Sequence, residues 1–268
     1  MIKPLVDYHM HTPLCGHAFG EPSEYAQRAI EVGLEEIGFS DHAPFFHMRD
    51  PGITMGIEQL PIYYKMIEDV RERYRKELTI KVGIEADFIP GYEPKTKALL
   101  ADYPYDYVIG SVHFIKDWGF DDPSQRAQWD EQDVNQVYRD YYDLLRRCAQ
   151  SGLYDIMAHV DLVKKFGNRA TQDMTKEVEK TAAVFKECGV AAEINTSGLR
   201  KHCKEIYPAF WNMEIYASAG VPLTFGSDSH DPHDVGADFE AAANLARKAG
   251  YKEYSVFKNR KIERTIKL

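Results

Sequence analysis

The stretch Leu5-Val6-Asp7-Tyr8-His9-Met10-His11 is the part of the chain that says most about its fold. A short apolar run leads directly into two histidines one residue apart. Residues i and i+2 of a β-strand point to the same side, so these two imidazoles would stand side by side at a strand end. Such a pair can bind one metal ion. The stretch therefore predicts a strand over residues 5–9 that ends in metal ligands, provided that other strands end in matching side chains.

The rest of the chain alternates short β-rich apolar runs with longer amphipathic stretches. Glycines such as Gly152 and Gly189 stand where helices should end, and the next apolar run follows at once. This alternation is typical of a parallel sheet, and seven repeats favour an α/β barrel. The expected strands are residues 5–9, 36–40, 80–86, 107–112, 155–158, 191–195 and 222–226. The expected helices are residues 22–32, 56–77, 94–101, 131–151, 171–188, 207–219 and 235–249.

Length and composition agree with this class and exclude several others. The 268 residues suit one barrel domain over residues 1–268, and 44% hydrophobic residues suffice for a large core. A net charge of -9 disfavours long nucleic acids and anionic membranes as partners. No run approaches the roughly 18 apolar residues of a membrane span. The N-terminus has no signal-peptide pattern and the four cysteines are scattered, so a cytoplasmic protein with reduced thiols is expected.

Ligand-type side chains recur at the C-terminal ends of the expected strands. A single histidine there is more often a hydrogen-bonded core residue than a metal ligand. In a barrel, however, these strand ends converge on one mouth, where nine imidazoles and carboxylates without cations would suffer desolvation and repulsion. The set therefore predicts a site with several metal ions. The nine residues are His9, His11, His17, His42, Glu85, His113, His159, Asp228 and His230.

The same residues carry a resemblance to the PHP (polymerase and histidinol phosphatase) superfamily, in order along nearly the whole chain. The resemblance implies a distorted (β/α)7 TIM-like barrel with a trinuclear metal site. The motifs that carry it are His9-x-His11 with His17, Ser40-Asp41-His42, Gly83-Ile84-Glu85, Gly110-Ser111-Val112-His113, Ala158-His159-Val160-Asp161 and Gly226-Ser227-Asp228-Ser229-His230.

The resemblance also divides the ligands among three divalent ions. The first ion takes His9, His11, Glu85 and Asp228, the second takes Glu85, His113 and His159, and the third takes His17, His42 and His230. Imidazole and carboxylate ligands without thiolate suit Zn, Fe or Mn and do not choose among them. A hydroxide shared by two ions would then attack the phosphorus of a phosphate monoester in line, with Glu85 and Asp228 holding the ions in place.

Two further segments, residues 159–167 and 193–201, narrow the resemblance to the histidinol-phosphate phosphatases of histidine biosynthesis. This likeness implies hydrolysis of L-histidinol phosphate to L-histidinol and phosphate. The alternative within the superfamily is a phosphoesterase that acts on a nucleotide or another small phosphate ester. An amidohydrolase-like metal hydrolase and a non-catalytic metal-binding domain are the other classes considered. The oligomeric state is left open.

The residues that would contact the substrate are less specific in sequence. Arg200 follows the sixth strand and could hold phosphate through two parallel hydrogen bonds. Lys164 or Lys165, after the fifth strand, could contact phosphate or belong to a solvated turn. His233 could contact phosphate or protonate the leaving group, or could simply begin a helix. The remaining candidates are Asp161, to orient His159 or donate a proton, Asp41, to orient His42, and Asn195, to bind substrate or end a strand.

Overall fold

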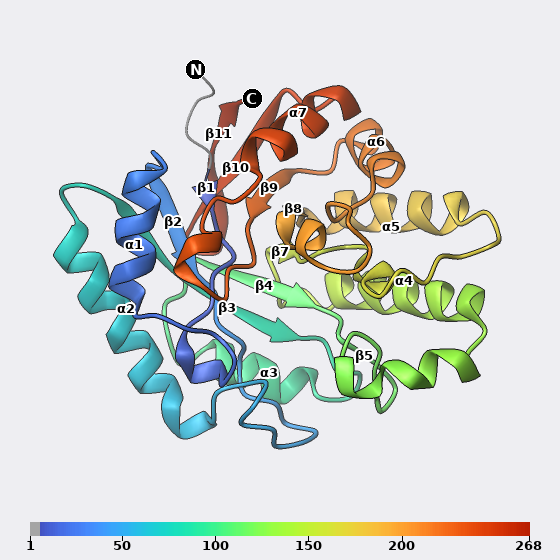
Figure 1. Cartoon of the computed structure of the whole chain (residues 1–268), viewed down its shortest axis with the longest axis horizontal. Coiled ribbons are helices and arrows are strands. Elements are labelled where there is room, and N and C mark those ends of the chain that lie inside the picture. The colour runs from blue at the N-terminus through green and yellow to red at the C-terminus, as the bar shows by residue number, and fades with distance from the viewer. Residues whose placement is uncertain (1–5) are drawn as a thin grey trace.

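The computed structural model describes residues 6–268, so Leu5 of the first expected strand lies outside the described residues. Seven parallel strands form one sheet in the order β1-β2-β3-β4-β7-β8-β9, with the helices around it (Figure 1). The strands are β1 (Val6–Asp7), β2 (Glu36–Phe39), β3 (Thr79–Asp87), β4 (Tyr107–Ser111), β7 (Ile156–Met157), β8 (Ala191–Asn195) and β9 (Leu223–Gly226).

The first and last strands approach each other and nearly close the sheet into a barrel. Three backbone hydrogen bonds join them: Tyr8 N–H to Phe225 O at 3.1 Å, Ser229 N–H to His9 O at 3.1 Å, and His11 N–H to Ser229 O at 2.9 Å. All three bonds lie just beyond the two-residue strand β1 and do not make a regular ladder. The predicted distorted (β/α)7 barrel is confirmed, and the irregular closure is its distortion.

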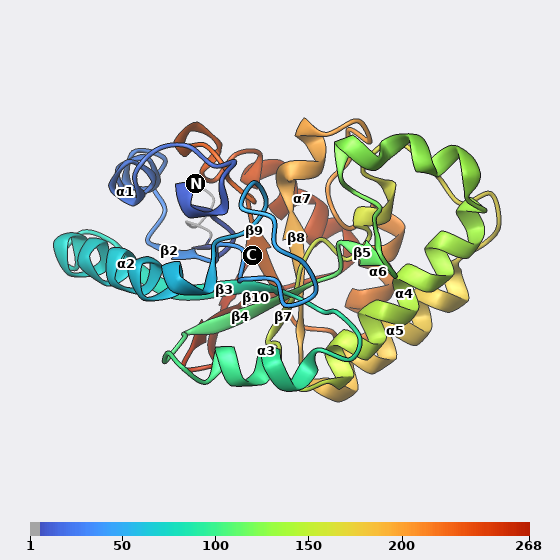
Figure 2. The ribbon, with the colours of Figure 1, turned by 90° about the horizontal axis from the view of Figure 1, so that it is seen from below.

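Helices follow the strands and cover the outside of the sheet (Figure 2). Two of them end as expected, because Gly189 and Gly220 adopt φ values of 72° and 71°, a left-handed conformation that side chains disfavour. Among the described residues, none of the helices is long and apolar enough to cross a membrane. The helices are α1 (Pro22–Glu31), α2 (Leu60–Tyr74), α3 (Glu93–Leu100), α4 (Val134–Gln150), α5 (Thr175–Cys188), α6 (Phe210–Ala219) and α7 (Phe239–Ala249).

Sequence periodicity missed two small hairpins. The strands β10 (Glu253–Lys258) and β11 (Lys261–Lys267) pair antiparallel, and β10 packs beside β9. Most of β11 is exposed, so it lacks the apolar alternation that marks a half-buried strand. The hairpin of β5 (Phe114–Ile115) and β6 (Trp118–Gly119), followed by the 3₁₀ helix η3 (Pro123–Glu131), occupies a region expected to be loop. The helix expected over residues 56–77 begins as the 3₁₀ turn η2 (Ile57–Gln59).

One buried tyrosine, Tyr107, crosses the inside of the barrel. Tyr107 on β4 extends across β3 and β2, and its hydroxyl donates a hydrogen bond to the carbonyl oxygen of Tyr8 at 2.7 Å. Gly83 and Gly38 line its path, and a Cβ at either position would overlap with the ring or the hydroxyl. Since Gly83 and Glu85 share one face of β3, this packing supports the strand segment that presents Glu85.

Replacing Tyr107 by alanine should therefore lower the free energy of unfolding by about 3–5 kcal/mol, because two glycines beside the ring cannot fill the cavity. Replacing it by phenylalanine keeps the ring and should lower the free energy by only about 1–2 kcal/mol through the lost hydrogen bond. Urea unfolding followed by circular dichroism measures both variants. Equal losses in the two variants would contradict a mainly packing role.

Candidate metal centre

The C-terminal ends of the strands bring all nine predicted ligand residues to one mouth of the barrel. Their nitrogen and oxygen atoms form small groups in which every atom lies within 4.8 Å of the others. Shared members make the groups continuous. The groups are His9, His11 and Asp228; His11, His42 and Glu85; Glu85, His113 and His159; and His17, His42 and His230.

Glu85 stands at the centre of this cluster and is only 1% exposed. Its two carboxylate oxygens face different sets of histidines. The Oε1 atom lies 3.3 Å from His159 Nε2 and 3.9 Å from His113 Nε2. The Oε2 atom lies 3.3 Å from His9 Nε2 and 2.9 Å from His42 Nδ1. This is the arrangement that a carboxylate bridging two cations requires.

Several buried polar atoms of the cluster have no hydrogen-bond partner within the described part of the chain. An unpaired buried polar atom costs about 1–3 kcal/mol, so native structures rarely keep several together without a reason. Cations would give these atoms partners, and imidazole with carboxylate is a donor set that divalent transition metals accept. The donor atoms of these residues therefore suit divalent metal ions. The unpaired atoms are His9 Nε2, His11 Nε2 and His230 Nε2, while His42 Nδ1 and Glu85 Oε2 lie 2.9 Å apart without the geometry of a hydrogen bond.

Three of the histidines, His9, His113 and His11, have a carboxylate beside their Nδ1 atom. His9 Nδ1 lies 2.7 Å from Glu193 Oε1, and His113 Nδ1 lies 2.9 Å from Asp87 Oδ1. A proton held on Nδ1 leaves Nε2 free to bind a cation. Sequence reasoning missed Glu193 and Asp87. The i, i+2 spacing of Glu193 before Asn195, and of Glu85 before Asp87, was the available signal.

Asp41 has a different partner from the expected one. Its Oδ1 atom lies 3.3 Å from the Nδ1 atom of His11 and accepts the backbone N–H of His42 at 2.9 Å. Its Oδ2 atom accepts a hydrogen bond from the Thr12 hydroxyl. Asp41 therefore orients the ring of His11, and the prediction that it orients the ring of His42 is corrected. Sequence adjacency to His42 was misleading because neighbouring residues of an extended segment point to opposite sides.

Neighbouring groups in the cluster shift one another's pKa values. Burial alone would raise the pKa values of Glu85 and Asp228, but the neighbouring imidazoles hold both well below their ordinary values. Burial would likewise lower the pKa of His113, yet Asp87 and Asp121 raise it to about 10. Burial and the imidazoles of His42 and His11 lower the pKa of His17 to about 4. Glu85 and Asp228 therefore remain carboxylates, able to ligate, at neutral pH.

Arg200 reaches the mouth from the 3₁₀ turn η5 (Thr196–Arg200) that follows β8. Its Nη2 atom donates to the carbonyl oxygen of Ser227 at 2.6 Å, and its Nε atom lies 3.1 Å from Asp234 Oδ2. Its Nη1 atom is buried and has no protein partner among residues 6–268. Two contacts thus fix the guanidinium beside the Asp228 loop and leave donor capacity for an anion.

Lys164 and Asp161 have structural partners instead of lining the site. Lys164 is 1% exposed, and its ammonium lies 2.8 Å from Asp161 Oδ2, 2.8 Å from the carbonyl oxygen of Ile206 and 3.1 Å from Glu205 Oε2. These contacts use all three of its donors, so the phosphate contact expected of Lys164 is not supported. Asp161 also accepts the backbone N–H of Ala209, and it makes no hydrogen bond to His159 in the described structure.

For His233 and Asn195 the structure favours the structural alternatives, because His233 lies in a 3₁₀ turn and Asn195 ends β8. The His233 side chain is 93% exposed, pairs with Asp231 at 2.8 Å and lines a surface cleft beside α1, so the structure does not bring it to the ligand cluster. Asn195 is fully buried, accepts the backbone N–H of Ser197 at 3.0 Å and donates to Glu193 at 3.0 Å. Asn195 is therefore engaged with the protein and not exposed to a substrate.

Two charged residues beside the cluster, Asp121 and Lys201, were not singled out in sequence, and Lys165 pairs with the first of them. Asp121, after β6, forms an ion pair with Lys165 at 2.9 Å and interacts electrostatically with His113 and His159. Burial lowers the pKa of Lys201, which interacts electrostatically with Asp228 and Asp121. The surroundings of the ligands thus carry both signs of charge, as a zwitterionic substrate would require.

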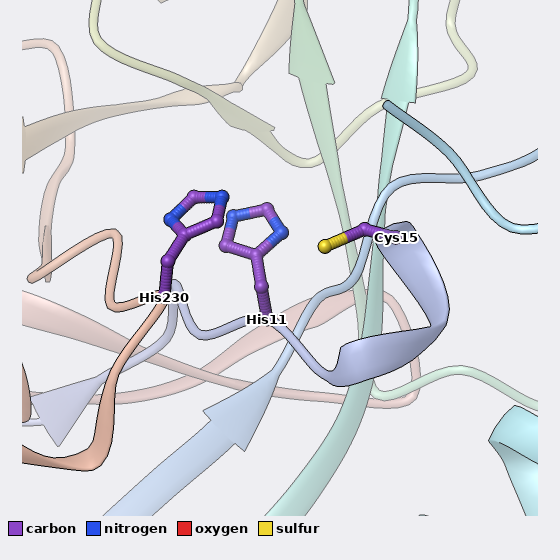
Figure 3. A group of neighbouring side chains, drawn as sticks. All are labelled: His11, Cys15 and His230. Carbon is purple, nitrogen blue, oxygen red and sulfur yellow. The ribbon is translucent and has the colours of Figure 1, made fainter. Parts of the chain in front are cut away.

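Cys15 lies close to two of the ligand histidines but on the far side of one ring. Its sulfur, His11 and His230 place their donor atoms within 4.8 Å of one another. Figure 3 shows the His11 ring standing between the Cys15 sulfur and the His230 ring, with a nitrogen toward each. Burial raises the pKa of the Cys15 thiol, which disfavours the thiolate form that binds metal ions. Cys15 is therefore a buried thiol beside the cluster.

Fold and site together define an α/β-barrel protein with a candidate multinuclear metal centre at the C-terminal mouth. The model of the PHP domain family matches residues 7–197, and the chain belongs to that family. The matched range contains seven of the nine candidate ligands, while Asp228 and His230 lie beyond it, in the loop after β9.

Curated relatives and a solved structure resemble the chain over almost its full length. A Deinococcus radiodurans protein described as a "probable histidinol-phosphatase" is 41% identical over 259 residues, which are 97% of this chain and 98% of the relative. The Bacillus subtilis histidinol-phosphatase is 31% identical, over 88% of this chain and 97% of its own. The Lactococcus lactis histidinol phosphate phosphatase, solved with Zn, L-histidinol and phosphate, superposes with a TM-score of 0.82 at 24% identity, covering 97% and 99% of the two chains.

Proposed function

We propose that this protein is a metal-dependent phosphomonoesterase that hydrolyses L-histidinol phosphate to L-histidinol and phosphate, a step of histidine biosynthesis. The observation that carries the proposal is Glu85, whose two buried oxygens face two separate groups of imidazoles. The names of relatives that match almost the whole chain support the choice of substrate.

The nine clustered residues would hold three divalent ions, Zn, Fe or Mn, divided as the family resemblance implies. Bound ions of this kind lower the pKa of water and neutralise charge on phosphoryl oxygens. Glu85 and Asp228 supply the negative charge that holds cations in this buried space. His9, His11 and the remaining histidines supply neutral nitrogens with fixed directions.

Arg200 would bind the phosphoryl group beside the ions. Its guanidinium is already fixed by Ser227 and Asp234, so little rotamer freedom is lost when an anion binds. A positive charge there favours the doubly charged phosphate and becomes more useful as charge builds on the transferring oxygens. Asp121, which pairs with Lys165 and interacts electrostatically with His113, would also present carboxylate charge to the primary amine of histidinol phosphate.

Replacing Arg200 by alanine should raise the Michaelis constant for histidinol phosphate by about 10- to 100-fold, the loss expected for a charge-assisted hydrogen bond. Steady-state phosphate release measures the change, with metal content determined in parallel. Arg169→Ala is the matched control, because Arg169 pairs with Glu205 on the exposed surface. An unchanged Michaelis constant in the fully metallated Arg200 variant would remove Arg200 from the phosphate site.

A panel of phosphomonoesters tests the substrate assignment directly. Histidinol phosphate, mononucleotides, sugar phosphates and a simple aryl phosphate are compared by kcat/KM at saturating metal. Histidinol phosphate should exceed the others by at least about 100-fold, because its amine and imidazole add contacts that the others lack. Preference for a nucleotide would establish the alternative phosphoesterase function. Hydrolysis of amides alone, or no hydrolysis at all, would refute the phosphatase assignment.

A further inference from the structure

We propose that Glu193 is a positioning residue that couples two of the three proposed metal sites. The inference rests on the metal binding in the proposed function and goes beyond it, because it predicts which ions depend on each other. Glu193 lies on β8, contributes no atom to the ligand groups described above and is 1% exposed.

The Glu193 carboxylate reaches ligands from two other strands. Its Oε1 atom lies 2.7 Å from Nδ1 of His9, which follows β1 and belongs to the first site. Its Oε2 atom accepts the backbone N–H of His159 at 2.9 Å, after β7, and His159 belongs to the second site. A single rigid carboxylate therefore sets the ring direction of one ligand and the backbone position of another.

The backbone conformations of two ligands show why such support is needed. His159 has a φ of 27° and Asp228 a φ of 54°, values that cost non-glycine residues of order 1–3 kcal/mol. Glu193 holds the N–H of His159, while Asn195 and Ser197 lie within 3.4 Å and 3.0 Å of the Asp228 carboxylate. Residues of β8 and the turn after it thus stabilise two strained ligands on the flanking strands.

Gly226 on β9 provides the space through which Glu193 reaches His9. A Cβ at Gly226 would overlap with Glu193 Oε1 and would lie 2.6 Å from the Cβ atom of His9. The carboxylate is the more movable of the two neighbours, so a side chain at this position would displace it from His9. The contact between Glu193 and His9 therefore requires a glycine at position 226.

The contacts of Glu193 require an acceptor on both oxygens. Besides His9 and His159, the Asn195 amide donates to Oε2 at 3.0 Å. A glutamine at this position has one oxygen and one NH₂ group. If the NH₂ group faces His159, it meets the backbone N–H of His159 and the amide of Asn195. These are donors as well, so both hydrogen bonds are lost. If it faces His9, it forces the His9 proton onto Nε2, which can then no longer bind metal.

Titration of the metal-free protein with Zn²⁺ against a competing chelator tests the proposal. In Glu193→Gln we expect two of the three dissociation constants to rise by about 10- to 100-fold, while the third, at His17, His42 and His230, stays within about twofold. Glu36→Gln is the matched control, a buried carboxylate on β2 that accepts from the Tyr8 hydroxyl and should leave all three constants unchanged. Three unchanged constants, or three equally weakened ones, in folded Glu193→Gln would overturn the coupling.

Gly226→Ala provides a second test through a different residue. It should weaken the same two constants, because the added methyl group displaces the Glu193 carboxylate. A selective loss of Zn²⁺ affinity at any other pair of sites would refute the proposed coupling through Glu193. Because the titration uses no substrate, it stays informative if the wild type hydrolyses a different ester. A wild type that binds no Zn²⁺ would instead refute the metal site on which the proposed function rests.

Discussion

Glu85→Gln is expected to abolish phosphate release, with kcat falling by about 10⁴-fold or more, while the barrel stays folded. The carboxylate is the only group of the cluster whose two oxygens face separate sets of imidazoles within the described chain. A glutamine has almost the same shape but only one ligating oxygen and no charge. One of the two sets would therefore face an NH₂ group that repels a cation.

Phosphate release and metal content should be measured together in this variant, with circular dichroism to confirm folding. We expect fewer bound ions per chain, because the charge that Glu85 contributes at the shared position is lost. Glu36→Gln again serves as the control, since it also neutralises a buried carboxylate in a neighbouring strand. Full metal content with wild-type turnover in Glu85→Gln would refute the proposed bridging role.

Removal of metal by a chelator is expected to eliminate turnover and to lower the thermal unfolding temperature. The buried atoms that lack partners, among them His11 Nε2 and His230 Nε2, would lose the cations proposed to satisfy them. Ions present at 100 times their dissociation constant stabilise the folded chain by about 2.7 kcal/mol for each site. The effect should therefore exceed that of any single surface substitution.

The measurement compares melting curves and phosphate release before chelation, after chelation and after addition of Zn²⁺, Fe²⁺ or Mn²⁺ separately. Restored activity should accompany a restored melting temperature for the metal that the site prefers. A chelated protein that contains no metal by elemental analysis and still releases phosphate at the original rate would refute metal-dependent catalysis.

Much of the fold was predictable because its signals are local. Apolar runs near Val82 and Ile109 lead into ligand-type residues, and glycines such as Gly189 end helices, so each βα unit is visible in a short window. The exposed strand β11 gave no such signal. Its pairing with β10, and the packing of β10 beside β9, become apparent only when the chain has folded.

The candidate ligands were predictable for a related reason. Parallel strands in a barrel all present their C-terminal ends to the same mouth, so a ligand-type residue at a strand end has a defined place. His9, Glu85 and Asp228 could therefore be grouped without coordinates. The roles of Lys164, Asp161 and His233 could not, because each follows a strand yet pairs with protein groups outside the ligand cluster.

By itself, the sequence determined the barrel class and which residue types meet at its mouth, because both follow from strand order and the two-residue side-chain period. Tertiary structure alone decided which carboxylate stands behind which imidazole. The contact between His9 and Glu193 joins residues 184 positions apart, and it depends on the space that Gly226 leaves between β8 and β1. Hydrogen-bond partners across strands depend on distances of a few tenths of an ångström, and only the packed barrel sets these distances.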